Sequence, residues 1–187
     1  MSVEPIRDPR ATTDPDLADV RAAQRDRAAF GTLYRRYLDR VYGYCFYLLG
    51  DHHDAEDVTE RTFLAAMSAI DRYRDEGASF RSWLFRIAHN QIANALRARG
   101  RHRATSLDAV SEPAVDGDPA GLVGLAEESR RLRRALDGLS VDRRQVLVLR
   151  FVDGLSSREI GVVLGRSPGA VRVLQLRALR DLAALLA

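Results

Sequence analysis

The chain has 187 residues, which suits one domain or two small ones, and 46% of them are hydrophobic, enough to form a core. All 29 basic residues are arginine, and the formal net charge is only +3. The single cysteine, Cys45, excludes an internal disulfide and fits a reducing cytoplasm. We expect neither a signal peptide, because the N-terminus is polar and contains proline, nor insertion into a membrane, because no apolar run approaches the roughly 20 residues required. The expected location is therefore cytoplasmic.

The charges are unevenly distributed along the chain. Residues 72–103 contain eight arginines and two acids, residues 104–129 contain six acids and no base, and residues 130–187 contain twelve arginines and five acids. Basic blocks attract nucleic acid. The pattern predicts two blocks that face nucleic acid, with an anionic tether between them.

The predicted elements follow a tail at residues 1–15, which we expect to be disordered. Apolar residues at three- and four-residue steps then predict a helix that ends at Gly50. Its apolar stripe comprises Phe30, Leu33, Tyr34, Tyr37, Val41, Tyr44, Cys45, Leu48 and Leu49. The polar residues from Asp51 to Asp54 suit the capped start of the next helix.

Two more helices complete a first predicted domain. The segment 54–73 places Val58, Thr62, Met67 and Ile70 on its buried side. After a loop at residues 75–78, Ser79 is expected to cap a helix over residues 80–99. Its apolar side comprises Trp83, Leu84, Ile87, Ile92 and Leu96. Because no segment shows the alternation of a strand, the predicted fold class is all-α.

Residues 104–124 have no apolar period and contain two prolines and three glycines, so they are predicted to be a flexible acidic linker. The predicted organisation is thus a tail at 1–15, a helical domain at 16–103, the linker at 104–124 and a second small helical domain at 125–187. In the second domain, Ser140 is expected to cap the segment VDRRQVLVLRFV, which ends at Asp153.

A helix-turn-helix is predicted at SSREIGVVLGRSPGAVRVLQLRALR, residues 156–180. Ser156 and Glu159 form a capping box at the start of the first helix, and Gly165 can take the left-handed conformation of the turn. Ser167 caps the second helix, with proline in its first turn. Gly161 suits a close helix crossing, and Val171 is expected to fill the angle between the helices.

The second helix of such a motif reads bases in the major groove through its N-terminal turns. Arginine favours guanine and glutamine favours adenine, while Ser167 at the helix N-terminus suits a phosphate. Val173 and Leu176 suit either the core or a thymine methyl group. The predicted duplex-binding set is Arg166, Ser167, Gly169, Ala170, Arg172, Val173, Gln175 and Arg177.

Three blocks in this order resemble a bacterial RNA polymerase sigma factor of the extracytoplasmic-function (ECF) group. They are DAEDVTERTFLAAMSAIDRYR, then SFRSWLFRIAHNQIANALRARGR, and, after the acidic linker, LSVDRRQVLVLRFVDGLSSREIGVVLGRS. The resemblance covers about residues 16–186. It implies a subunit that binds core polymerase and directs promoter recognition, strand opening and transcription initiation.

The resemblance also implies where core polymerase, through its beta and beta-prime subunits, is bound. The family uses the helix that begins D-A-E-D, which here supplies Asp54, Glu56, Asp57, Glu60 and Phe63. The acids also suit the helix dipole, and Phe63 suits core and interface equally. The family's usual glutamine-glutamate pair is replaced here by Glu60 and Arg61.

The following loop and helix resemble the part that captures the unpaired strand of the minus-ten element. A basic groove with aromatic faces suits single-stranded DNA. The candidate residues are Tyr73, Phe80, Arg81, Trp83, Arg86, Asn90, Arg97, Arg99, Arg101 and Arg103. Trp83 also suits the core, and the last four arginines also suit a solvated helix end.

The C-terminal block resembles the domain that reads the minus-thirty-five element as duplex DNA. The family's common serine-arginine pair is replaced here by Val173 and Leu174, so the base sequence that is read stays open. Such factors are often held inactive by an anti-sigma factor, which we also expect here.

No catalytic, cofactor or metal site is predicted. The run from Asp51 to Asp54, with His52 and His53, is too tight for its side chains to converge on one ion. Two alternatives remain open at this point: a helix-turn-helix regulator that acts without being a polymerase subunit, and a protein-interaction module in which the arginines only confer solubility.

Overall fold

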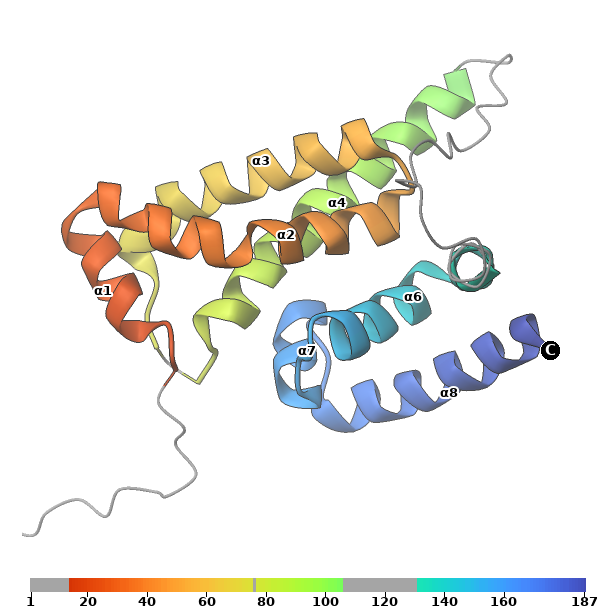
Figure 1. Cartoon of the computed structure of the whole chain (residues 1–187). Helices are drawn as coiled ribbons and strands as arrows, with labels where there is room; N and C mark the ends of the chain where they lie inside the picture. Colours follow the sequence, from red (N-terminus) through yellow and green to blue (C-terminus); the bar gives the residue numbers. More distant parts are fainter. Residues whose placement is uncertain (1–13, 76, 106–130) are drawn as a thin grey trace, which may run out of the picture.

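The computed structural model describes residues 14–75, 77–105 and 131–187, and its described part is helical without a strand (Figure 1). The all-α prediction is thus confirmed. The predicted tail and linker lie outside the described residues, except for the ends of each. The predicted linker starts two residues too early, because helix α4 continues through Ala104 to Thr105.

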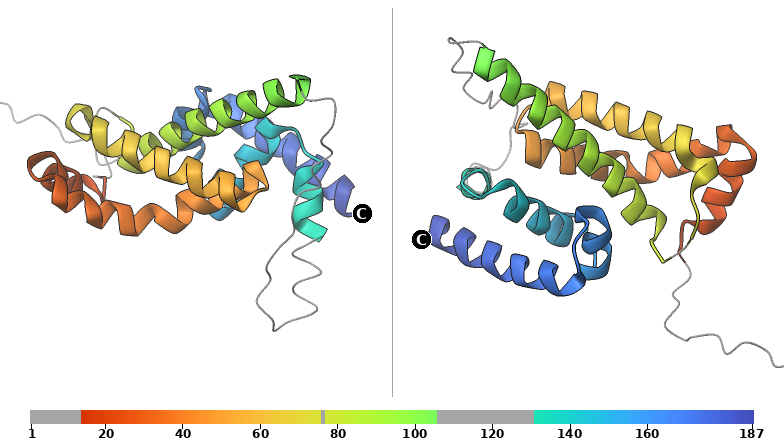
Figure 2. Two further views of the ribbon diagram at one scale, coloured as in Figure 1. Left: turned by 90° about the horizontal axis from the view of Figure 1, so that it is seen from above. Right: turned by 180° about the vertical axis from the view of Figure 1, so that it is seen from behind.

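The first domain is built on three long helices, α2 (Phe30–Leu49), α3 (His52–Ala69) and α4 (Phe80–Thr105), which pack against one another (Figures 1 and 2). The shorter α1 (Leu17–Arg25) and the single turns η1 (Arg27–Ala29) and η2 (Ile70–Arg72) close one end. Leu33, Tyr44 and Phe85 are fully buried in the core between the long helices.

The turn between α2 and α3 follows the predicted chemistry. Gly50 adopts φ of +73°, which glycine takes without a steric cost. The carboxylate of Asp51 accepts a hydrogen bond of 2.8 Å from the backbone N–H of Asp54, which caps α3. The cap predicted here is confirmed, although α3 begins at His52.

Asp14 departs from the predicted tail of residues 1–15, because it is buried and belongs to the first domain. Its carboxylate accepts hydrogen bonds from the backbone N–H of Phe80 and, at 3.2 Å, from the hydroxyl of Tyr73. The partners lie about sixty residues away along the chain, so local composition does not indicate them. Asp14 therefore ties the start of the domain to the start of α4.

The second domain contains a helical segment at residues 131–137, α6 (Val141–Leu147), the wide π-helical turn η3 (Val148–Val152), α7 (Ser157–Leu164) and α8 (Pro168–Leu186). The single helix predicted over residues 141–152 is therefore two elements. In η3 the backbone N–H of Asp153 bonds to the carbonyl of Val148, five residues back, at 3.1 Å.

The predicted helix-turn-helix is formed by α7 and α8. Its capping box is present: the Ser156 hydroxyl accepts from the Glu159 N–H at 3.2 Å, and the Glu159 carboxylate accepts from the Ser156 N–H at 2.9 Å. Gly165 adopts φ of +64° in the turn, and Ser167 accepts from the Ala170 N–H at 3.2 Å. Val171 is fully buried between the helices.

We had expected Gly161 to be required by a close crossing of the next helix. The structure shows that the turn itself requires it. A Cβ atom at this position would lie 2.6 Å from the backbone carbonyl oxygen of Arg166. The N–H of Arg166 bonds to the carbonyl of Gly161 at 2.9 Å, so the turn folds back directly onto this residue.

The two domains contact each other, with α7 packed against α4 and η3 against α2 (Figure 2). Buried apolar side chains of both domains form one continuous cluster. Polar contacts also cross the boundary: Arg40 donates to the backbone carbonyl of Asp153, and the guanidinium of Arg133 lies 3.9 Å from the ring centre of Phe46.

Asp153 is an unusual buried acid at this boundary. Its side chain is 1% exposed, and neither carboxylate oxygen has a hydrogen-bond partner among the described residues. Burial raises the pKa of Asp153 to about 7, although the positive charges of Arg40 and Arg81 act in the opposite direction. The Nε atom of Arg40 is 3.8 Å from the nearer carboxylate oxygen.

The substitution Asp153→Asn is expected to stabilise the protein above neutral pH. The folded protein keeps the Asp153 proton between about pH 4 and pH 7, whereas the unfolded chain loses it, so this group's contribution to stability falls as pH rises through that window. Asparagine stays neutral and escapes this loss. In thermal unfolding, the Tm of the variant relative to that of the wild type should rise from pH 5 to pH 8. The expected rise is about 2 to 4 °C for each kcal/mol of stability that the wild type loses.

The control for this prediction is Asp181→Asn, because Asp181 lies in α8, is partly exposed and pairs with Arg143 within the second domain. It should show no such gain at high pH. Parallel pH profiles for Asp153→Asn and the wild type would show that Asp153 does not titrate in this range.

Alanine substitutions at two helical glycines should have opposite effects. Gly161→Ala forces its methyl group against backbone and is expected to lower stability by about 1 to 3 kcal/mol. At Gly169 the nearest atom to a new Cβ is the Ser167 oxygen at 4.0 Å, so Gly169→Ala should be neutral or stabilising by up to about 1 kcal/mol. Urea unfolding of both variants measures the difference, and equal effects would refute the steric role of Gly161.

Candidate functional site

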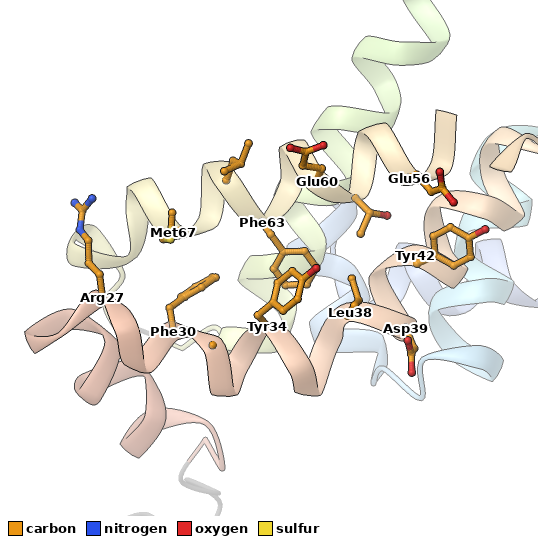
Figure 3. A pocket seen from close by; sticks show the side chains of 13 residues that line it. Arg27, Phe30, Tyr34, Leu38, Asp39, Tyr42, Glu56, Glu60, Phe63 and Met67 are labelled. Carbon is orange, nitrogen blue, oxygen red and sulfur yellow. The ribbon is translucent and has the colours of Figure 1, made fainter. Parts of the chain in front are cut away.

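An open groove of about 600 Å³ lies between α2 and α3 (Figure 3). Phe30, Tyr34 and Leu38 line it from α2, and Phe63 and Leu64 line it from α3, with Met67 further along α3. The rings of Tyr34 and Phe63 meet edge to face, with their centres 4.8 Å apart. Phe63 is buried at the floor, whereas Tyr34 is 40% and Leu64 51% exposed. The groove therefore presents apolar surface to a partner.

Acidic groups stand along this groove. Glu56 and Glu60 project from α3, and Asp39 lies on the α2 side (Figure 3). The structure thus brings together three of the predicted polymerase-binding residues, Glu56, Glu60 and Phe63. Sequence reasoning missed the α2 wall, because Tyr34 was assigned to the buried stripe of its helix. Its exposure follows from how α3 packs, which periodicity does not show.

Asp54 and Asp57, the other two residues predicted to bind polymerase, lie outside the groove lining. Asp54 pairs with Arg99 of α4, and the carboxylate of Asp57 is 3.0 Å from the guanidinium of Arg61, one turn along α3. Arg99 also donates to the carbonyl of Leu49 at 2.8 Å. Asp54, a predicted polymerase-binding residue, and Arg99, a predicted DNA-binding residue, therefore form an ion pair with each other.

The three aromatic candidates for the minus-ten strand form a packed cluster at the start of α4. Tyr73 and Phe80 are buried, and Trp83 is partly buried against both, with ring centres 5.3 and 5.6 Å away. The hydroxyl of Tyr73 shares its single proton between the carboxylate of Asp14, at 3.2 Å, and the carbonyl of Ala78, at 3.0 Å. The faces of Tyr73 and Phe80 are therefore not open to a base in this structure.

The basic candidates on α4 differ in their surroundings. Arg86, Asn90 and Arg97 are exposed, and their spacing of four and seven residues places them on one face of the helix. Arg101 is exposed as well. The side chain of Arg103 lies outside the described residues. Arg86, Asn90 and Arg97 thus form a polar, basic face along α4.

Arg81 differs from the other arginines of α4, because it is bound by the second domain. Its guanidinium donates to the carboxylate of Glu159 in α7, with Nη2 at 2.6 Å and Nε at 3.1 Å. The hydroxyl of Ser79 donates to the same oxygen at 3.0 Å. The loop before α4 is therefore in direct contact with the helix-turn-helix.

The first turns of α8 project away from the core of the second domain. Ser167, Gly169, Ala170, Arg172 and Arg177 are exposed, and Gln175 is half-buried. Val173 and Leu176 are both 51% exposed, so the alternative that they belong to the core is wrong. The guanidinium of Arg166 pairs with Asp142 of α6.

His52 and Cys45 both have surroundings that suit a packing role in the first domain. His52 stacks on Phe46, with ring centres 4.2 Å apart. Burial raises the pKa of the Cys45 thiol to about 12. Among the residues that the structure places, no three histidine, cysteine or acidic side chains are grouped as metal ligands. Likewise, none of the described helices is long and apolar enough to span a membrane.

Comparison with known proteins identifies both domains. Residues 33–102 match the family Sigma-70 region 2, and residues 129–182 match the family Sigma-70, region 4. The first match covers α3, most of α2 and most of α4, including most of the groove and the basic face. The second covers the helix-turn-helix.

Individual relatives extend the similarity over nearly the whole chain. The ECF RNA polymerase sigma factor BldN of Streptomyces coelicolor is 36% identical over 95% of this chain and 69% of its own. The ECF RNA polymerase sigma factor SigE of Mycolicibacterium smegmatis is also 36% identical, over 91% of this chain and 65% of its own. The chain thus spans about two thirds of the length of these two relatives.

A solved structure agrees with both domains at once. The sigma factor RpoE of Bartonella quintana, crystallised with the anti-sigma factor NepR, superposes with a TM-score of 0.72 and 28% identity. The match covers 84% of this chain and 96% of that one. These findings exclude the two alternatives, a regulator independent of polymerase and a simple interaction module. The chain belongs to the extracytoplasmic-function group of RNA polymerase sigma factors.

Proposed function

We propose that this sigma factor binds core RNA polymerase through the α2–α3 groove, holds the unpaired minus-ten strand along α4 and reads the minus-thirty-five duplex with α8. The observation that carries the proposal is the occurrence on one chain of an apolar groove with acidic edges, a basic helix face and an exposed recognition helix. We propose no catalytic role for it.

The groove suits an amphipathic helix of the polymerase. Apolar anchors enter such a groove at helical spacing, and charged edges select the partner's flanking charges. Tyr34, Phe63 and Leu64 offer the apolar contacts, and Glu56 and Glu60 would favour basic residues beside the anchors. Asp54 and Asp57 contribute indirectly, by fixing the start of α3 and its neighbour α4.

The face formed by Arg86, Asn90 and Arg97 suits the phosphates of a single strand. Tyr73 and Phe80 do not belong to this face, because they are buried where the loop packs against the first turn of α4. Trp83, which keeps part of its ring exposed, is the aromatic group best placed to stack on a base.

We assign the binding of duplex DNA to the N-terminal turns of α8. Arg172 and Arg177 suit guanine or phosphate, and the exposed Val173 suits a thymine methyl group. Ser167 uses its oxygen to cap α8 and keeps its hydroxyl proton for a phosphate.

We also propose that an anti-sigma factor restrains this protein, which acts in the cytoplasm. Support comes from the solved relative, which was crystallised with such a partner. The exposed apolar side chains of the groove offer that partner a surface, and its occupation would exclude polymerase.

The first test is co-elution of the purified chain with bacterial core RNA polymerase, followed by run-off transcription from a pool of promoters of the source genome. We expect a stable complex and new transcripts whose start sites share two upstream elements. Tight duplex binding by the chain alone, with no polymerase complex, would contradict the proposal.

A charge placed in the groove should abolish polymerase binding without unfolding the protein. Leu64 is exposed, so Leu64→Asp costs little folding energy but buries a carboxylate at the proposed interface. We expect affinity for core polymerase to fall by at least about a hundredfold. Leu185→Asp, in the similarly exposed last turn of α8, is the control and should retain the complex; equal affinities for both variants would rule out the groove.

A further inference from the structure

The carboxylate of Asp14 closes the base of the loop that precedes α4. One of its oxygens accepts from the backbone N–H of Phe80, the first residue of α4, and from the hydroxyl of Tyr73, where the loop begins, at 3.2 Å. The other oxygen accepts from the N–H of Asp16 at 3.0 Å. Because Asp14 is buried, a single shielded side chain holds the two ends of the loop together.

Hydrogen bonds also hold this loop on the side that faces α1. The structure describes residues 73–75 and 77–79 of the loop, and those at 74, 75 and 77 are exposed. A hollow of about 530 Å³ lies between the loop and α1, so apolar packing contributes little on this side. The side-chain amide of Gln24 in α1 donates to the carbonyls of Ile70, at 2.9 Å, and Tyr73, at 3.1 Å. The position of the loop therefore depends on a few polar contacts.

The same contacts set the surroundings of Trp83, the only tryptophan of the chain. The ring of Tyr73 packs against Trp83 with centres 5.3 Å apart, and the ring of Phe80 does so at 5.6 Å. Burial, followed by the charge of Asp14, raises the pKa of the Tyr73 hydroxyl above its usual range. The hydroxyl therefore keeps its proton and shares it between Asp14 and the carbonyl of Ala78. Asp14 thus restricts Tyr73, and Tyr73 restricts the ring of Trp83.

A second carboxylate fixes Asp14 to the body of the first domain. Asp16 is buried, pairs with the guanidinium of Arg36 and accepts from the hydroxyl of Tyr37, and both partners belong to the long helix α2. Asp14 and Asp16 lie before residue 33, where the match to Sigma-70 region 2 begins. The match therefore assigns no role to either carboxylate.

We propose that Asp14 is a positioning residue for capture of the minus-ten strand, because it holds the loop before α4 and the ring of Trp83 in place before DNA binds. This inference rests on the proposed role of α4 and Trp83 in strand binding. A loop that is already ordered loses less conformational entropy when it binds, so its affinity is higher. Asp14 is buried, so it acts through Tyr73 and Phe80 and not on a base.

The test uses Asp14→Asn and Tyr73→Phe in the full chain. Asparagine keeps the size of the buried side chain but has one acceptor oxygen, whereas Asp14 uses both of its oxygens. Tyr73→Phe keeps the packed ring and removes only the hydroxyl. The matched control is Asp26→Asn, because Asp26 is exposed at the far end of α1 and its carboxylate accepts from the N–H of Ala28. Thermal unfolding and co-elution with core polymerase check that each variant is folded.

Run-off transcription with core polymerase measures strand capture. Two templates carry the same promoter, chosen from those that the wild type transcribes: one is fully paired, and the other is unpaired from the minus-ten element to the start site. On the paired template, Asp14→Asn and Tyr73→Phe should each give about tenfold less transcript, because strand capture must offset the cost of unpairing. On the unpaired template the loss should shrink to about twofold, because that cost is absent. Asp26→Asn should match the wild type on both templates.

Two further measurements separate positioning from general stability. The double variant should lose little more transcript than the worse single variant, because both changes break the same hydrogen bond. In the free chain, Trp83 fluorescence reports the position of this ring alone, since no other tryptophan contributes. Well below the unfolding temperature, Asp14→Asn should make Trp83 more accessible to quenching by acrylamide, and Asp26→Asn should leave the quenching unchanged.

Full transcription by Asp14→Asn from the paired template would overturn the proposal. An equal loss on both templates together with weaker polymerase binding would also overturn it, since it would show a role in folding alone. Failure of the wild type itself to bind polymerase or to give transcripts is a separate result, which would overturn the proposed function before any variant is compared.

Discussion

The N-terminal ends of helices impose the constraint on which every functional surface of this protein depends. The first N–H groups of a helix lack partners within it and must find an acceptor elsewhere. Asp51 supplies one for α3, Asp14 for α4, Ser156 for α7 and Ser167 for α8. The caps of α3, α4 and α8 each begin a helix that carries part of the groove, the basic face or the recognition surface, and the cap of α7 begins the helix that packs against α8.

Two of these caps also connect distant parts of the fold. Asp14 joins the beginning of the first domain to α4, and Glu159 completes the cap of α7 while it binds Arg81 across the domain boundary. The same atoms thus satisfy a local requirement and set a long-range arrangement. A carboxylate has about four acceptor sites, which makes this dual role possible.

The sequence was enough to predict helix caps and turns, but not the contacts between residues that lie far apart along the chain. The turn at Gly50, the capping box at Ser156 and the left-handed Gly165 each depend on neighbours within a few residues, and the structure confirms them. The family blocks likewise identified both domains. The burial of Asp14 and the wide turn at the end of α6 depend on partners or packing that no periodicity reveals.

The candidate sites show the same division. Acidic residues on α3 were found from their motif, but the α2 wall of the groove was not, because an apolar stripe does not tell which of its members a neighbouring helix covers. Tyr34 stays exposed, whereas Tyr73 and Phe80, with similar side chains, are buried. Pairing is equally hidden: nothing in the spacing of Asp54 and Arg99 indicates that they meet across two helices.

The wide turn at Val148–Val152 has a consequence for how this region can change in evolution. A π-turn corresponds to an α-helix with one residue inserted, accommodated without breaking the helix. Loss of that residue would restore a regular ladder and rotate Asp153 by about 100° about the axis, away from Arg40. Segment length, more than residue identity, should therefore distinguish relatives that keep this contact between domains from those that do not, and an alignment of the segment between α6 and α7 can check it.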